Sequence, residues 1–546
     1  MLQLLKHNIG TRRLTHFVAR RDYVKSLLWL VGLTAFAVFV TYALNDVYGS
    51  PESLVAMVET LKNPAMIALV GPVYGASHYT LGAMTAGEML LMTATLVAVV
   101  NIFFVVRYTR ADEEQERMEV IRSLPVGRLA PLNAALIGAA VFNALLTAGI
   151  GLGFMALNFD PVTTGIDLQG GLLFGGMCGA IGLVFAGVAA VFAQLASTSR
   201  GAIAYSSVFL GALYLLRAVG DVRGAAGETL ARVSPLGLGL RVEAFSGNHF
   251  WPLPWLALEA LAFIAVAYVL NTRRDLGAGF IAARAGRSHA AAGLGTAPGL
   301  AWRLLRTTMI GWAVTMLVLG ATYGSIMGDV ETFINSNDFF KAALAAPQGY
   351  TLAESFAALI MVVMSGMATA PLLQVALKAR QEESAGRAEH VLACGVSRPG
   401  FFASYAALAA LASVVMPLCA ALGVWTAAAA VMDEPFKLSF ILKAQLVYVP
   451  ALWLFLAIAL LAMALVPRAA SALSWGYFIV SFLLSYFGRL FTGLPEWLPK
   501  LVPFGYVPRL PMEDINWTTM SLMSALALAL AAVAFVLYRR RDLQTS

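Results

Sequence analysis

The sequence carries few charges for its length. Of its 546 residues 12% are charged and 60% are apolar, and the mean hydropathy is +0.77. Ordinary soluble domains carry about twice that charged fraction, so the composition excludes a soluble fold. Lys and Arg outnumber Asp and Glu by 37 to 30. We attribute this excess to membrane topology and expect no nucleic acid partner, since no basic stripe with interleaved aromatics lies outside the apolar stretches.

Cysteine is scarce, and nucleotide-binding motifs are missing. The three cysteines, Cys178, Cys394 and Cys419, are isolated and odd in number, which excludes a disulfide framework and a CxxC metal site. The six histidines are scattered, so we expect no metal site and no catalytic residues, and a membrane-embedded enzyme is disfavoured. No G-x-x-x-x-G-K-[ST] phosphate loop occurs, so this chain cannot bind nucleotide in that manner.

Long apolar stretches dominate the rest of the sequence. A helix needs roughly 20 apolar residues to cross a bilayer, and twelve such windows start near residues 26, 86, 132, 171, 202, 251, 304, 353, 402, 439, 472 and 518. This predicts an all-α polytopic membrane protein with both termini on one side. That side holds 26 of the 37 Lys and Arg residues, so the positive-inside rule places both termini in the cytoplasm. Abundant Ala, Gly and Arg indicate a GC-rich bacterial genome, and hence the bacterial plasma membrane.

The first 25 residues combine basic and apolar side chains. Six Lys and Arg residues are interspersed with leucines, Ile9, Phe17 and Val18. This pattern predicts an amphipathic helix lying on the inner leaflet. The alternative is a basic flank that only orients the first span.

The sequence contains an internal duplication. Residues 112–128 align without a gap onto 382–398 at an offset of 270, with five identical positions. Arg273-Arg274-Asp275-Leu276 recurs as Arg540-Arg541-Asp542-Leu543 at nearly the same offset. We therefore predict two six-span units, residues 1–271 with the N-terminal helix and residues 303–546, joined by a cytoplasmic linker at 272–302. Because each unit has an even number of spans, the repeats are parallel and form a central cavity.

Each copy of the duplicated segment is acidic and follows the second span of its unit. Glu113 and Arg117, and likewise Glu383 and Arg387, stand at positions i and i+4 with the acid first, the favourable order on a helix. We therefore expect one short charged helix in each copy. A solvated loop that carries helix-stabilising pairs is the alternative.

These two segments resemble those of ABC-type exporter permeases, specifically the two-unit family related to tetronasin, polyether-ionophore and multidrug resistance exporters. That family carries E-E-x-G-R-x-E followed by P-V-x-R after the second span of each half. The first copy keeps most of this pattern but has Glu116 in place of Gly, and the second has Gly386 but carries Gly395 in place of Pro. In span layout the resemblance covers essentially the whole chain.

The resemblance implies the permease subunit of an exporter that moves hydrophobic or amphiphilic compounds, such as antibiotics, ionophores and drugs, out of the cell. Each acidic segment would be a coupling helix docked on a separate cytoplasmic ATPase dimer, which binds the ATP and Mg²⁺, so this chain needs no cofactor of its own. Membrane lipid and a lipophilic substrate are the other partners. The implied coupling residues are Glu113, Glu114, Arg117, Glu119, Arg128, Glu382, Glu383, Arg387, Glu389 and Arg398.

One charged side chain lies well inside a predicted span. Charges there are costly and mark functional candidates, so Glu259 faces a polar transport cavity, pairs with a cation such as Arg217, or is a packed protonated carboxyl. It would carry the proton in the alternative function, a proton-driven transporter of the major facilitator type. That family's loops are short and basic, whereas these are acidic. Elsewhere, glycines at 171, 175 and 179 repeat every four residues, a pattern typical of close helix packing.

Overall fold

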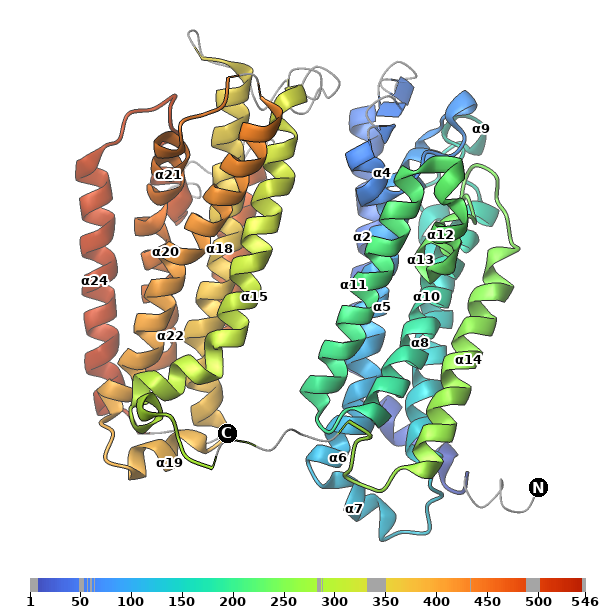
Figure 1. The fold of residues 1–546 in the computed structure, drawn as a ribbon, viewed down its shortest axis with the longest axis horizontal. Helices are drawn as coiled ribbons and strands as arrows, with labels where there is room; N and C mark the ends of the chain where they lie inside the picture. The colour runs from blue at the N-terminus through green and yellow to red at the C-terminus, as the bar shows by residue number, and fades with distance from the viewer. Residues whose placement is uncertain are drawn as a thin grey trace. The chain divides into compact units, whose positions relative to one another are not determined.

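The computed structural model describes residues 8–48, 54–55, 57–58, 61–62, 64–281, 286, 288–330, 350–432, 434–487 and 501–542. Every regular element within these ranges is helical. The chain divides into two compact units, Met1–Ala285 (unit 1) and Gly286–Ser546 (unit 2). Figure 1 shows each unit as a bundle of long helices.

Unit 1 contains six long helices with shorter ones between them. The long helices are α2 (Thr11–Tyr48), α5 (Leu81–Val106), α8 (Ala130–Met155), α10 (Leu168–Leu195), α11 (Ser199–Val222) and α14 (Pro252–Arg273). The shorter elements are α4 (Pro64–Val70), η1 (Ala76–His78), η2 (Arg107–Ala111), α6 (Asp112–Glu114), α7 (Arg117–Arg122), α9 (Pro161–Thr164), η3 (Gly224–Gly227), α12 (Glu228–Val233) and α13 (Pro235–Leu240).

Unit 2 has a similar order of elements. Its longer helices are α15 (Ala297–Ser325), α18 (Leu352–Ser384), α20 (Arg398–Val431), α21 (Leu438–Leu446), α22 (Val449–Leu465), α23 (Ala470–Phe487) and α24 (Trp517–Arg540). The shorter elements are η4 (Ala292–Gly295), η5 (Met327–Asp329), α19 (Arg387–Ala393) and η7 (Pro503–Tyr506).

Eleven helices among the described residues are long and apolar enough to cross a membrane. They confirm the predicted all-α polytopic membrane fold. The span expected from residue 472 corresponds to α23, whose apolar stretch Ala470–Ser485 is shorter in the described part of the chain, so the count of twelve stays a prediction. The proposed unit limits, 1–271 and 303–546, the linker at 272–302 and the parallel relation of the repeats also stay predictions.

Residues 8–25, the described part of the N-terminal basic segment, do not form a separate helix. Residues 11–25 are the first turns of α2, which continues without a break to Tyr48 over 38 residues. At 1.5 Å per residue α2 is roughly 57 Å long, well beyond the ~30 Å of hydrocarbon that a span must cross. The basic segment is therefore an extension of the first span, and its position on the inner leaflet stays a prediction.

The core of unit 1 is built around α10, which packs against α5, α8 and α14. The glycine stripe makes this possible, because a β-carbon at Gly175 would lie 2.6 Å from the backbone oxygen of Thr147 on α8. The predicted close helix packing is thus confirmed. Asn101 on α5 and Asn143 on α8 are buried beside α10, and their side-chain amides donate to each other over 3.1 and 2.8 Å. In unit 2 the most buried spanning helix is α18, which packs against α20 and α22.

Candidate functional site

The acidic segment of each unit lies at one end of its bundle, which we call the motif end (Figure 1). In unit 1 the chain leaves α5 through η2 and α6, turns at Glu116, and continues as α7. In unit 2, α18 runs to Ser384 and the chain turns at Gly386 before α19. Each copy therefore contains a short charged helix, as predicted, but the helix begins only after the turn, so Glu113 and Glu383 do not lie on it.

The turn explains the glycine of the family pattern. Glu116 has φ 58° and Gly386 has φ 73°, both in the left-handed region that glycine adopts most readily. In unit 1 the β-carbon of Glu116 makes this conformation sterically unfavourable, whereas Gly386 in unit 2 adopts it without that strain. The turn also sends α7 and α19 away from the axis of the preceding helix, so their arginines meet different acids from those expected.

The first acid of each copy pairs with the arginine after the turn. Nη1 of Arg117 lies 3.0 Å from Asp112 Oδ1, and Arg387 binds both oxygens of Glu382 at 2.7 and 2.9 Å. The hydrogen bond to Glu382 raises the pKa of Arg387 above its ordinary value. The expected i,i+4 pairs of Arg117 with Glu113 and of Arg387 with Glu383 are thus wrong. The helical spacing does not hold across the turn.

A second cation supports each of these pairs. In unit 1 it comes from α2, where Arg21 lies 3.1 Å from Asp112. In unit 2 it comes from α18 itself, where Lys378 lies 2.9 Å from Glu382. The two units therefore use different helices to neutralise the same position of the motif.

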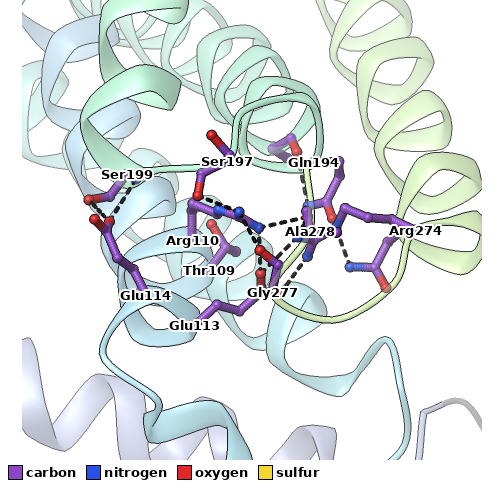
Figure 2. Close-up of polar contacts among 12 residues, drawn as sticks. Thr109, Arg110, Glu113, Glu114, Gln194, Ser197, Ser199, Arg274, Gly277 and Ala278 are labelled. Atoms are coloured by element: carbon purple, nitrogen blue, oxygen red, sulfur yellow. Dashed lines mark hydrogen bonds and ion pairs between the residues drawn. The ribbon is translucent and has the colours of Figure 1, made fainter. Parts of the chain in front are cut away.

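The second acid of unit 1 is enclosed by two arginines (Figure 2). Glu113 has a side chain only 9% exposed and accepts two hydrogen bonds from Arg274, at 2.8 and 2.5 Å. Arg110 donates a third over 2.9 Å, and its two terminal nitrogens also donate to the backbone oxygens of Ser197, Gly277 and Ala278 at 2.5, 2.9 and 3.0 Å. We call Arg110, Glu113 and Arg274 the Glu–Arg cluster of unit 1.

Unit 2 repeats this arrangement. Glu383, with a side chain 1% exposed, accepts two hydrogen bonds from Arg541 at 2.7 and 2.6 Å. Arg380 lies 3.6 Å from Glu383 and donates to the backbone oxygen of Pro467 over 3.0 Å. Arg380, Glu383 and Pro467 stand at the same offset from Arg110, Glu113 and Ser197 that relates the two acidic segments. Arg380, Glu383 and Arg541 form the Glu–Arg cluster of unit 2.

Arg128 and Arg398, both predicted coupling residues, contact the same region. Arg128 donates to the backbone oxygens of Asn271, at 3.0 and 2.7 Å, and of Arg274. Arg398 donates to the backbone oxygen of Arg541 over 2.9 Å. Each therefore binds backbone acceptors at the end of the last helix of its unit, where carbonyls lack helical partners.

The remaining predicted coupling residues are exposed. Glu114 accepts hydrogen bonds from the backbone amide, over 2.8 Å, and the hydroxyl of Ser199 at the start of α11. Glu119 on α7 and Glu389 on α19 are exposed, and Val120 beside Glu119 is 71% exposed. The surface available to a partner is thus the outer face of α7 and α19, and the buried acids Glu113 and Glu383 do not belong to it.

Sequence reasoning missed the arginines that bind the buried glutamates. Arg274 and Arg541 were visible as part of a repeated Arg-Arg-Asp-Leu segment, but nothing in the repeat indicated their partners. Arg110 and Arg380 lie just before the aligned segments, at the same offset. Because both positions hold arginine, an alignment extended toward the N-terminus would have pointed to them.

Glu259 lies on α14, and its Oε2 atom is enclosed without a hydrogen-bond partner among the described residues. The suggested partner Arg217 is bound elsewhere. It lies 3.5 Å from Asp221 and donates to the backbone oxygens of Ile67 and Ala68 near the end of α4. The prediction of an Arg217–Glu259 pair is therefore wrong, while the role of Glu259 in a transport cavity stays a prediction. No three His, Cys, Asp or Glu side chains converge as a metal site in the described ranges.

Comparison with known proteins shows the family to which this chain belongs. Residues 294–539 match the family model for the C-terminal domain of the multidrug efflux system permease Rv1217c. Over 542 residues the chain is 34% identical to the multidrug efflux system permease protein Rv1217c of Mycobacterium tuberculosis (strain ATCC 25618 / H37Rv), covering 98% of this chain and 95% of the relative. The chain therefore belongs to this family of multidrug efflux permeases, consistent with its resemblance to ABC-type exporter permeases.

Proposed function

We propose that this chain is the permease subunit of an ATP-driven exporter and that the outer faces of α7 and α19 dock on a separate cytoplasmic ATPase dimer. The supporting observation is that each unit carries one exposed short helix, α7 or α19, directly after a buried Glu–Arg cluster. Such an element, joined closely to the spanning helices, can pass a movement of the partner on as a rigid-body movement. The ATPase would bind ATP and Mg²⁺, and this chain would bind no cofactor.

The cargo we propose is hydrophobic or amphiphilic, such as antibiotics, ionophores and drugs. The name of the relative states multidrug efflux for that protein, and the membrane-spanning helices of this chain are strongly apolar. With the positive-inside count, we place both termini and both motif ends in the cytoplasm of a bacterial cell.

The test uses the exposed face, because charge reversal at Glu113 or Glu383 would disturb the buried clusters. The chain is purified gently from its native membrane as wild type, as the Glu119→Arg, Glu389→Arg double variant, and as Asp514→Arg, an exposed acid before α24 at the opposite end of unit 2. We expect an ATPase of nucleotide-binding-domain size with the wild type and the Asp514 variant only. All three should elute alike in size-exclusion chromatography if they are equally folded.

The opposite result would favour the second candidate. A chain that purifies alone and still transports a lipophilic dye in vesicles, driven by a proton gradient and not by ATP, would be a secondary transporter. The observation on its side is Glu259, an intramembrane acid without an ion pair in the described residues, as a proton carrier requires.

A further inference from the structure

The Glu–Arg clusters connect parts of each unit that are far apart in the sequence. In unit 1, Glu113 lies on α6, Arg274 follows α14, and Arg110 binds the backbone of Ser197 between α10 and α11. In unit 2, Glu383 ends α18, Arg541 follows α24, and Arg380 binds the backbone of Pro467 between α22 and α23. Each cluster therefore joins the ends of four long helices at the motif end.

The geometry distinguishes these clusters from ordinary surface ion pairs. Exposed pairs hold two flexible side chains together weakly, whereas here each glutamate is almost fully buried and receives two parallel hydrogen bonds from one guanidinium. Such bidentate pairs fix the orientation of both groups. Arg110 is only 1% exposed, and its two terminal nitrogens also donate to three backbone oxygens that belong to two different connections.

Each cluster also lies directly before the turn that leads to the exposed helix. Only three residues separate Glu113 from the start of α7, and only three separate Glu383 from the start of α19. A force applied to α7 or α19 thus reaches the cluster through one short turn. Arg128 and Arg398, on the other side of these helices, bind the last helix of the same unit. Both ends of the exposed segment are therefore anchored to the same place.

We propose that Glu113 and Glu383 are positioning residues that transmit movement. In each unit the glutamate forms a rigid joint that passes on movement of the short exposed helix. In unit 1 the movement of α7 reaches α14 and the connection between α10 and α11. In unit 2 the movement of α19 reaches α24 and the connection between α22 and α23. Without the joint, the turn at Glu116 or Gly386 absorbs the movement. This inference rests on the proposed function, because it requires an ATPase to apply the force.

The test compares variants that break the joint with variants that leave it intact. Native-membrane vesicles that contain the chain and its co-purifying ATPase are prepared with Glu113→Gln, Glu383→Gln, or Arg274→Lys. The last keeps the charge but cannot form the paired hydrogen bonds of a guanidinium, so it serves where a glutamine variant does not fold. Glu228→Gln, which removes an exposed ion pair with Arg232 elsewhere in unit 1, is the matched control.

Three quantities are measured in each preparation: the amount of ATPase that co-purifies, ATP hydrolysis, and ATP-dependent movement of a lipophilic fluorescent dye. We expect the joint variants to retain the ATPase and its hydrolysis, while dye moved per ATP hydrolysed falls about tenfold, within the usual range for coupling between sites. The Glu228 control should match the wild type in all three. A merely structural role would instead lower all three quantities together, in proportion to the loss of folded protein.

Failure of the inference and failure of the proposed function give different results. If the folded joint variants move as much dye per ATP as the wild type, the joint does not transmit movement and the inference is overturned. If all three quantities fall together, the clusters serve folding alone, which also overturns it. If the wild type itself binds no ATPase and its dye movement ignores ATP, the proposed function is wrong.

Discussion

The left-handed turn predicts that one substitution at its central residue stabilises unit 1 and that another destabilises unit 2. Glu116→Gly relieves the steric cost of a β-carbon at φ 58°, about 1–2 kcal/mol, but glycine loses about 0.4–1 kcal/mol more backbone entropy on folding. The net result is a gain in local stability of roughly 0.5–1 kcal/mol. Gly386→Ala reverses both terms and loses a similar amount. No atom lies within 4 Å of the added β-carbon at Gly386, so backbone conformation alone decides the outcome.

The assay is hydrogen–deuterium exchange of the peptides that cover α7 and α19. Because the turn controls local opening of the short helix that follows it, a change of 1 kcal/mol alters the exchange rate by about fivefold. We expect two- to fivefold slower exchange in α7 of Glu116→Gly and equally faster exchange in α19 of Gly386→Ala. Glu119→Gly, inside α7, is the control and should accelerate exchange, because glycine weakens a helix interior. Slower exchange in Gly386→Ala, or faster exchange in Glu116→Gly, would refute the reasoning.

Two further predictions concern the interior and the topology. Gly182→Ala places a methyl group against the paired amides of Asn101 and Asn143, so we expect it to lower stability by about 1–3 kcal/mol, measured as the thermal midpoint in detergent, whereas Gly211→Ala, with no atom within 4 Å, should not. An unchanged midpoint for Gly182→Ala would argue against the packing of α10. Cys394, exposed after α19, should react with a membrane-impermeant maleimide in inside-out vesicles and not in intact cells, while buried Cys178 reacts in neither. Labelling of Cys394 in intact cells would invert the proposed orientation.

The sequence predicted the helices more reliably than their ionic contacts. Apolar windows of about 20 residues identify spans directly, and alignment of the two halves located both acidic segments. The partners of the acids could not be predicted, because they depend on the turn at Glu116 and Gly386. One left-handed residue moves Arg117 from Glu113 to Asp112 and leaves Glu113 free for Arg274, more than 150 residues away in the chain.

The same reason explains why two of the predicted coupling residues, Glu113 and Glu383, are enclosed by arginines. An acid in a charged segment is expected at the surface, and Glu119 and Glu389 are there. Glu113 and Glu383 lie before the turn and closer to the bundle, where buried arginines compensate their charge. Only the path of the backbone distinguishes these two classes of acid. The N-terminal segment shows a similar limit, since its amphipathic composition did not indicate that it continues into α2.

The contact between Glu114 and Ser199 has no counterpart in the second half of the protein. The aligned positions there are Ser384 and Ala469, which cannot form a carboxylate–hydroxyl bond. In a symmetric homodimer every substitution occurs twice, so both copies of a contact are gained or lost together. Fusion of two duplicated genes removes that constraint and lets selection act on one copy alone. Unit 1 thus keeps a bond between α6 and α11 that unit 2 does without, and the two halves have diverged in how firmly they hold the same motif.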